Sequence, residues 1–185
     1  IGSLTLGALP ARVGSMGKFD RNPQRYINLF AGSVQNHRRA MENIHRLAND
    51  AAGLNLNRVL PGNGKTGFIS SSINYLYMLE ALALLGITDA PVMKIGMSYP
   101  LNTGEIAAFA NGLDRVYVVE ELEGFLEYQI KRLLYDSGLR VPVIGKQVFP
   151  EYGELDVDDI ASRIGNELRI TPPARIQRSL SLSKE

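Results

Sequence analysis

Cysteine is absent from this chain of 185 residues, and only two histidines are present. The absence of cysteine excludes disulfides, thiolate metal sites and a cysteine nucleophile, and two histidines leave few ligands for a zinc ion. An excess of one charge is also lacking, because 20 Lys and Arg stand against 19 Asp and Glu. This balance gives no electrostatic reason to expect a nucleic acid or an anionic membrane as a partner. We therefore expect neither a metal site nor a nucleic-acid interface.

Long hydrophobic runs are missing too. The apolar stretches fall well short of the ~20 residues that a membrane span needs, and the amino terminus lacks a positive segment followed by a hydrophobic one. We expect a cytoplasmic protein with no membrane partner. Hydrophobic residues make up 45% of the chain and charged residues 21%, which is enough apolar material for one domain with a core.

Three regions are expected along the chain. Residues 1–22 show neither a helical nor a strand period, so an irregular arm is predicted there. The domain occupies residues 23–170, and its N-terminal extension includes a helix from a Ser33 N-cap to about Ala52. Residues 171–185 contain paired prolines and are typical of a linker or tail.

The middle of the chain alternates strictly between strand and helix patterns. Strands are predicted at 66–70, 92–96, 116–120 and 141–144, and helices at 72–85, 103–111, 123–135 and 156–168. This order predicts an α/β fold of three layers, with a mostly parallel sheet and helices on both faces.

Polar residues follow three of these strands, and parallel strands would bring them to one crevice. Ser70, Ser71 and Ser72 could bind a phosphate or carboxylate with the free amides of the next helix. Plain N-capping is the more common role of serine at such a position. Ligand binding by these serines is therefore the weaker of the two readings.

Tyr99 precedes Pro100, which favours an extended conformation for the tyrosine and suits an interface more than catalysis. Glu120 and Glu121 are neighbours on an expected strand, so their side chains point to opposite faces and cannot act jointly on one atom. A hydrolase with two carboxylates is therefore unfavoured, and we expect one to cap a helix or contact a neighbouring domain. No catalytic residue is predicted.

Several segments in order resemble one known family. They are NPQRY at 22–26, ISSSINYLY at 69–77, KIGMSYPL at 94–101, VVEELEGFLE at 118–127, and the short motifs Gly-Lys, Phe-Pro and Gly-Glu-Leu between residues 145 and 155. Together they resemble the middle of the large subunit of indolepyruvate:ferredoxin oxidoreductases, over roughly residues 20 to 160.

The resemblance implies a transketolase C-terminal-like domain of a thiamine-diphosphate-dependent 2-oxoacid:ferredoxin oxidoreductase. Such an enzyme decarboxylates an aryl pyruvate, yields an acyl coenzyme A and reduces ferredoxin through iron-sulfur clusters. Thiamine diphosphate and Mg would belong to modules on either side of this domain, which would hold no cofactor itself. The chain is then expected to be an inactive domain fragment that packs against those modules and helps to form a homodimer.

Two other hypotheses remain open at this point. The chain could be a small-ligand module that binds phosphate or coenzyme A at its serine loop. It could also be a free-standing interaction protein with a contact patch at Tyr99 and Glu121. The sequence does not give the 2-oxoacid, the strand order or the oligomeric state.

Overall fold

The computed structural model describes residues 14, 17–19 and 21–172. The chain divides into two compact units, an N-terminal unit, Ile1–Glu42, and a core unit, Asn43–Glu185. The predicted arm and tail lie largely outside the described residues, so the domain boundaries stay predictions. None of the described helices is both long and apolar enough to cross a membrane.

Helix α1 (Pro23–Tyr26) in the N-terminal unit begins at Asn22, whose side chain accepts a hydrogen bond from the Arg25 amide at 3.1 Å. Helix α2 (Phe30–Asp50) follows and runs on into the core unit, where a 3-10 turn (Ala51–Leu54) ends the segment. The predicted Ser33 N-cap is wrong. Ser33 lies inside α2, and its hydroxyl donates to the Phe30 carbonyl at 2.6 Å, a local bond that serine forms readily within helices.

The core unit contains one five-stranded sheet of order β1-β3-β2-β4-β5. Its strands are β1 (Arg58–Leu60), β2 (Thr66–Ser71), β3 (Val92–Ile95), β4 (Arg115–Val119) and β5 (Val143–Ile144). β2 to β5 pair in parallel, and β1 pairs antiparallel with β3 at the edge. The mostly parallel sheet predicted from the sequence is confirmed, whereas β1 was not predicted.

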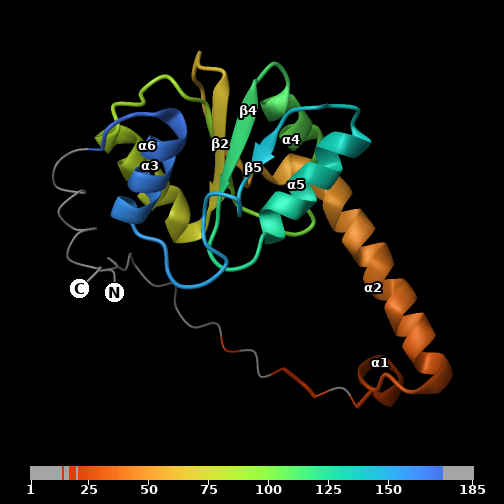
Figure 1. Cartoon of the computed structure of the whole chain (residues 1–185). Coiled ribbons are helices and arrows are strands. Elements are labelled where there is room, and N and C mark those ends of the chain that lie inside the picture. The colour runs from red at the N-terminus through yellow and green to blue at the C-terminus, as the bar shows by residue number, and fades with distance from the viewer. Residues whose placement is uncertain (1–13, 15–16, 20, 173–185) are drawn as a thin grey trace. The chain divides into compact units, whose positions relative to one another are not determined.

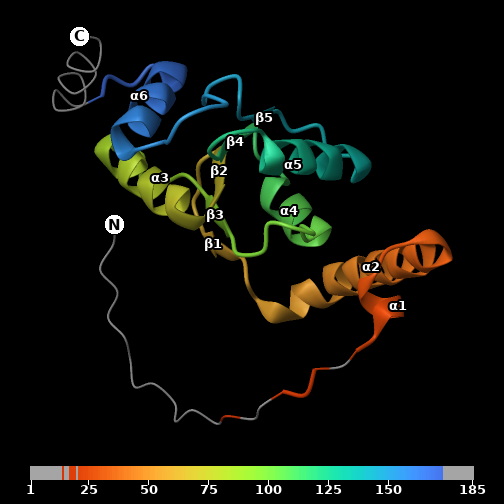
Figure 2. The ribbon, with the colours of Figure 1, turned by 90° about the horizontal axis from the view of Figure 1, so that it is seen from below.

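Four helices cover the two faces of this sheet. They are α3 (Ser72–Leu84), α4 (Thr103–Ala110), α5 (Phe125–Asp136) and α6 (Val157–Leu168). Figures 1 and 2 show α3 and α6 together on one face and α4 and α5 on the other. The predicted strands and helices between 66 and 168 therefore exist, each within two residues of its expected boundaries.

Local chemistry sets several of these boundaries. The Asn102 side chain accepts from the Glu105 amide at 3.2 Å and so caps α4. Gly86 after α3 and Gly138 after α5 have positive φ, which glycine adopts without steric cost at the end of a helix.

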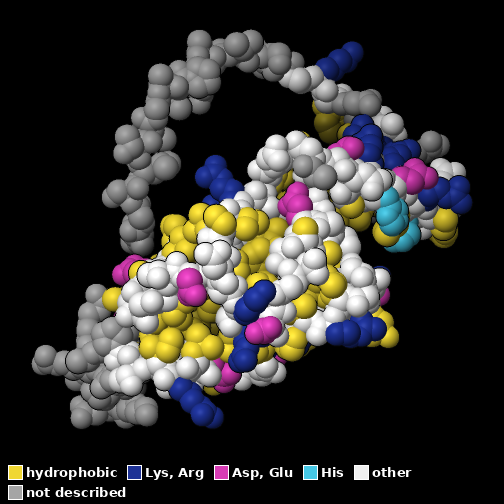
Figure 3. All heavy atoms as spheres, turned by 90° about the horizontal axis from the view of Figure 1, so that it is seen from above, with side chains coloured by type: hydrophobic (Ala, Val, Ile, Leu, Met, Phe, Trp, Pro, Cys, Tyr) yellow, Lys and Arg dark blue, Asp and Glu magenta, His cyan; other side chains and the backbone are white. Residues whose placement is uncertain are grey.

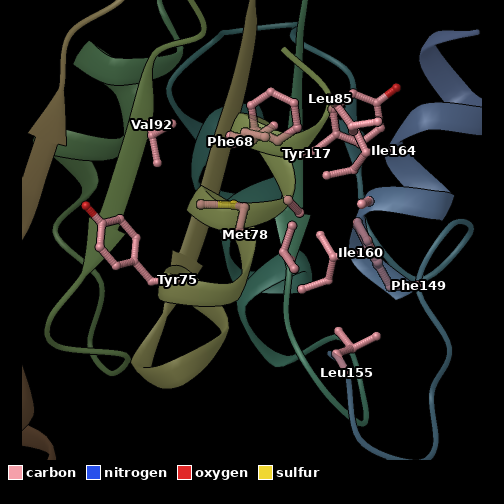
Figure 4. Close-up of a cluster of buried hydrophobic side chains, with 14 residues drawn as sticks. Phe68, Tyr75, Met78, Leu85, Val92, Tyr117, Phe149, Leu155, Ile160 and Ile164 are labelled. Carbon is pink, nitrogen blue, oxygen red and sulfur yellow. The ribbon is translucent and has the colours of Figure 1, made fainter. Parts of the chain in front are cut away.

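Alternate side chains of the central strands pack into two separate hydrophobic cores. Phe68 of β2 and Tyr117 of β4 point to the α3 and α6 face, where their rings stack at 5.4 Å between centroids. Figure 4 shows both rings with Ile160 and Ile164 of α6. The neighbouring residue Ile69 points to the α4 and α5 face. This period of two is why the sheet needs helices on both sides.

Candidate functional site

The loops that follow the parallel strands lie at one edge of the sheet, which we call the carboxyl edge. It comprises the loops 71–73, 96–102, 120–124 and 145–156. Parallel pairing places Ser70 at the end of β2 opposite Val119 at the end of β4. The β3 loop also reaches α5, because the Gln129 side-chain amide donates to the Ser98 carbonyl at 3.3 Å. The polar loops therefore come together as the alternating pattern predicts.

Glu120 follows β4 and caps α5. Its carboxylate accepts hydrogen bonds from the amides of Leu126 at 2.8 Å and Glu127 at 2.9 Å. These amides belong to the first turn of a helix, where they lack partners inside the helix and where the dipole favours negative charge. The Glu120 residue is 7% exposed, and its burial raises the pKa of the carboxyl. The two amide bonds and Lys146 oppose that rise in pKa without cancelling it.

Glu127 links α5 to the loop that follows β5. Its carboxylate accepts from the Lys146 backbone amide at 2.8 Å and forms an ion pair with the Lys131 ammonium. Only 2% of Glu127 is exposed, so the pairing compensates a charge that is costly to bury. Gly145 lies so close to this carboxylate that a Cβ atom at that position would overlap it.

The Lys146 side chain turns inward across the same loop. Its ammonium donates to the backbone carbonyls of Glu120 and Pro150. Burial lowers the pKa of Lys146, although the carboxylates of Glu120 and Glu127 favour its charged form. We call Glu120, Glu127, Lys131 and Lys146 the charged network. It joins β4, α5 and the loop after β5.

An open cavity of about 530 Å³ lies beside the charged network. Its lining residues are Glu127, Tyr128, Lys131, Lys146, Gln147, Glu151 and Tyr152. The volume suits a small molecule, but the lining lacks the predominantly apolar character of most ligand sites. In the part of the chain that the structure describes, no three His, Cys, Asp or Glu side chains are grouped to hold a metal ion.

Glu121 has a different partner from Glu120. Its carboxylate accepts from the Leu155 amide at 2.9 Å and so fixes the end of the long loop before α6. The two neighbouring carboxylates serve separate structural contacts, which agrees with the expectation that they cannot act on one atom.

Tyr99 and Pro100 lie in the β3 loop, and the peptide bond between them is cis. The Tyr99 ring is 54% exposed and lies against the ring of Phe125, at 6.4 Å between centroids. Phe125 is itself 54% exposed, whereas Pro100 is partly buried. Exposed aromatic rings of this kind suit a protein contact, because they offer large area with little conformational freedom to lose.

The three serines differ from one another. Ser70 is fully buried, and its hydroxyl donates to the Val119 carbonyl at 2.7 Å, so it serves the sheet. Ser71 occupies the N-cap position of α3 but makes no side-chain capping bond. Ser72 begins the helix with a positive φ of 52°. In the first turn, the Asn74 residue is largely buried and its Oδ1 atom has no hydrogen-bond partner.

Sequence reasoning missed Glu127, Lys146 and Phe125 as parts of this edge. Glu127 and Phe125 follow the pattern of an ordinary amphipathic helix, and nothing local indicates that a glutamate there is buried. Lys146 lies in a Gly-Lys pair that belongs to the family resemblance, which was the available signal.

Comparison with protein families identifies the family of this chain. The model of the indolepyruvate oxidoreductase domain matches residues 58–180. A curated relative, the indolepyruvate oxidoreductase subunit IorA of Thermococcus kodakarensis, is 33% identical over 178 residues, which cover 91% of this chain and 28% of that protein. The subunit of the same name from Methanothermobacter marburgensis is 34% identical over 152 residues, or 80% of this chain and 24% of that protein. The chain thus spans about a quarter of the length of these relatives.

One solved structure shows the same fold at low sequence identity. A 2-oxoglutarate:ferredoxin oxidoreductase from Magnetococcus marinus, with 2-oxoglutarate, coenzyme A and succinyl-CoA bound, matches 72% of this chain and 23% of that chain at a TM-score of 0.53 and 16% identity. A split-gene transketolase, described as an inactive beta4 tetramer, matches 61% of this chain and 42% of that chain at a TM-score of 0.48 and 19% identity.

Proposed function

Because the chain belongs to the family of indolepyruvate oxidoreductase domains, we propose that it is an assembly module of a thiamine-diphosphate-dependent 2-oxoacid:ferredoxin oxidoreductase. The complete enzyme would oxidatively decarboxylate an aryl pyruvate, form an acyl coenzyme A and reduce ferredoxin. The role of this chain is non-catalytic: it packs against the thiamine-diphosphate-binding modules of the same enzyme through its carboxyl edge.

The observation that carries this proposal is a difference between the buried and the exposed side chains of the carboxyl edge. The buried charged side chains there are engaged in holding the edge together, since Glu120 caps α5 and Glu127 fixes the loop after β5. The same edge exposes an aromatic surface around Tyr99 and Phe125. An edge that is held together by these hydrogen bonds and that exposes aromatic rings is suited to contact with another protein module.

The residues of this chain do not fit the iron-sulfur clusters of the complete enzyme. Iron-sulfur clusters are held by cysteine thiolates, and the sequence contains no cysteine. Among the described residues, no three His, Cys, Asp or Glu side chains are grouped to hold a metal ion. The proposal therefore assigns the electron-transfer clusters to other modules, places thiamine diphosphate and its metal ion there as the family resemblance implies, and assigns no chemical step to this chain.

A double substitution tests the proposed assembly role. Tyr99→Ala with Phe125→Ala should weaken binding to separately produced thiamine-diphosphate-binding modules by about tenfold or more, because both rings lose their contact area. Tyr135→Ala, which removes a tyrosine from the far end of α5 that is 67% exposed, is the matched control and should leave binding unchanged. Unaltered affinity in the double variant would refute the carboxyl edge as the contact surface. Turnover of an aryl pyruvate by this chain alone would refute the non-catalytic role.

We propose a second candidate function, binding of phosphate or coenzyme A at the start of α3, on a separate observation. The Ser71 hydroxyl makes no capping bond, so it remains available to donate to a phosphate oxygen beside the free amides at the start of the helix. Calorimetric titration with coenzyme A and with inorganic phosphate tests this function. Binding that is lost in a Ser71→Ala, Ser72→Ala variant with an unchanged melting temperature supports it, and absence of heat with both ligands refutes it.

A further inference from the structure

Strand β1 leaves one border of the sheet open. It stands at the end of the strand order and pairs with β3, and no strand among the described residues lies on its other side. All three of its residues are exposed, and the apolar side chains of Val59 and Leu60 are 51% and 43% exposed. An open border of this kind presents unpaired amides and carbonyls with which a strand of another chain can pair.

The register of the sheet shows which backbone groups of β1 face this border. The Phe68 amide of β2 donates to the Pro91 carbonyl at 3.0 Å. Amide and carbonyl change sides from one residue to the next along a strand, so Lys94, three residues further on, turns its own toward β1. Lys94 pairs with Arg58. The next residue of β1, Val59, therefore directs its amide and carbonyl away from the sheet and toward the open border.

A groove runs beside this border on the α4 face of the sheet. Val59 pairs with Met93, whose side chain belongs to the core under α4 and α5, so Val59 points to the same face. Two cavities of about 460 Å³ and 400 Å³ adjoin there, because Val59, Ala108 and Phe109 line both of them. Figure 3, which looks onto the amino ends of the parallel strands, shows hydrophobic side chains gathered on the core unit. The groove can receive an apolar side chain from a strand that is added beside Val59.

The other face of β1 carries positive charge that is not balanced. Arg58 on β1 lies directly opposite Lys94 on β3, and like charges at opposite positions destabilise a sheet. The Lys94 ammonium lies 5.4 Å from the centroid of the Tyr75 ring. Within the described part of the chain, no carboxylate forms an ion pair with either cation. A carboxylate on an added strand, placed beside Arg58, would offset this repulsion.

We propose that β1 is the docking site of an extended segment of a partner protein, which adds to the sheet as a further strand antiparallel to β1. The residue opposite Val59 is apolar and enters the groove, and the residue opposite Arg58 is acidic. The residue opposite Leu60 is apolar and covers its exposed side chain. In antiparallel order the segment is therefore of the type Val-Leu-Glu.

The length and composition of β1 restrict the partner further. Because the strand has three residues and is followed by Pro61, which lacks an amide donor, the backbone contact is short and the side chains must supply specificity. A second copy of this chain does not fit, since its own β1 has no acidic residue to place beside Arg58. The site lies on a different border from the loops of the carboxyl edge, so the inference is independent of the proposed function.

Nuclear magnetic resonance on the full chain tests the backbone pairing with a synthetic probe. The probe is a macrocyclic β-hairpin peptide that displays Thr-Val-Leu-Glu-Thr on its open strand, because a preorganised strand loses less entropy on binding. Binding should slow hydrogen exchange of the Val59 amide by about tenfold or more. The matched control is the same peptide with an N-methyl group on its leucine. It keeps every side chain but cannot donate to the Val59 carbonyl, so it should bind about tenfold more weakly or worse.

A charge exchange tests the acidic position. The natural chain should bind the probe about tenfold more tightly than a probe with lysine in place of glutamate, and Arg58→Glu should abolish or reverse this preference. Arg115→Glu, at an exposed arginine that begins β4, is the matched control and should keep the preference. Melting temperatures measured on both variants exclude unfolding as the cause of any loss.

Three results would overturn the proposal. They are an unprotected Val59 amide at about 1 mM probe, equal binding of the N-methylated peptide, and a preference for glutamate that survives Arg58→Glu. Protection of the Val59 amide without the probe, if it increases with the concentration of the chain, would identify a second copy as the occupant and would also overturn it. Binding of thiamine-diphosphate-binding modules through Tyr99 and Phe125 is measured separately, and none of these results bears on it.

Discussion

Glu120 is the residue on which the order of the carboxyl edge depends most directly. Its carboxylate satisfies two amides at the start of α5, and its backbone carbonyl accepts the Lys146 ammonium. A single residue at the end of β4 thus holds both the following helix and the loop after β5. Burial raises the pKa of this carboxyl and hydrogen bonding lowers it, and burial has the larger effect.

The raised pKa of Glu120 gives a prediction for stability against pH. The carboxyl binds its proton more tightly in the folded protein than the ordinary value of 4.5 allows, so its ionisation lowers the stability of the fold. The contribution of Glu120 to the unfolding free energy is greatest below about pH 4.5, and it declines as the pH rises through the pKa of the folded protein. Glu120→Gln removes this titration. The unfolding free energy of the natural protein, minus that of Glu120→Gln, should therefore fall as the pH rises above about 4.5.

Chemical denaturation of both proteins across that range measures the difference. Glu123→Gln is the control, because Glu123 is exposed in the same loop and its removal should leave the pH dependence unchanged. If the difference instead rises with pH, the two amide bonds to the ionised carboxylate outweigh its burial, and the direction given for the pKa is wrong.

At the scale of elements, the contact between α5 and the loop after β5 depends on a missing side chain. Gly145 leaves room for the Glu127 carboxylate, which holds the Lys146 amide. Gly145→Ala should cost about 1–3 kcal/mol of unfolding free energy, because the added methyl group displaces a buried ion-paired carboxylate. Gly104→Ala is the control, since a Cβ atom there has only an ordinary contact with Asn102 at 3.5 Å and lies in the first turn of α4.

Thermal and denaturant unfolding of both variants checks this prediction. Gly104→Ala should equal or exceed the natural protein in stability, because alanine is the better helix former. A Gly145→Ala protein as stable as the natural one would show that Glu127 can move without losing its partners, and would remove the reason for glycine at that position.

The elements that the sequence predicts are those with local causes. Asn102, Gly86 and Gly138 set helix ends through their own side chains or backbone freedom, and the helix ends there lie within two residues of the predicted ranges. Strand β1 has only three residues, all exposed, and forms by pairing with β3 about 34 residues away, so no local pattern reveals it. The same reason hides Glu127: its burial follows from a loop 19 residues further along the chain. At Ser33 a local pattern was misleading. Serine is a common capping residue, but here it lies inside a helix that begins at Phe30.

At the scale of the whole molecule, the two units contribute unequally to stability. Every buried hydrophobic side chain of the described residues lies between Ala51 and Ile164, and the family match, 58–180, also falls wholly within the core unit. A protein of residues 43–185 should therefore unfold cooperatively, with a melting temperature within about 4 °C of the full chain measured as a monomer at low concentration. Circular dichroism and calorimetry on both proteins measure the difference, and a protein of residues 61–185, which lacks β1, is the control that should melt lower. A large loss of stability in residues 43–185 would contradict this prediction and would show that residues 1–42 contribute to the folding free energy of the core unit.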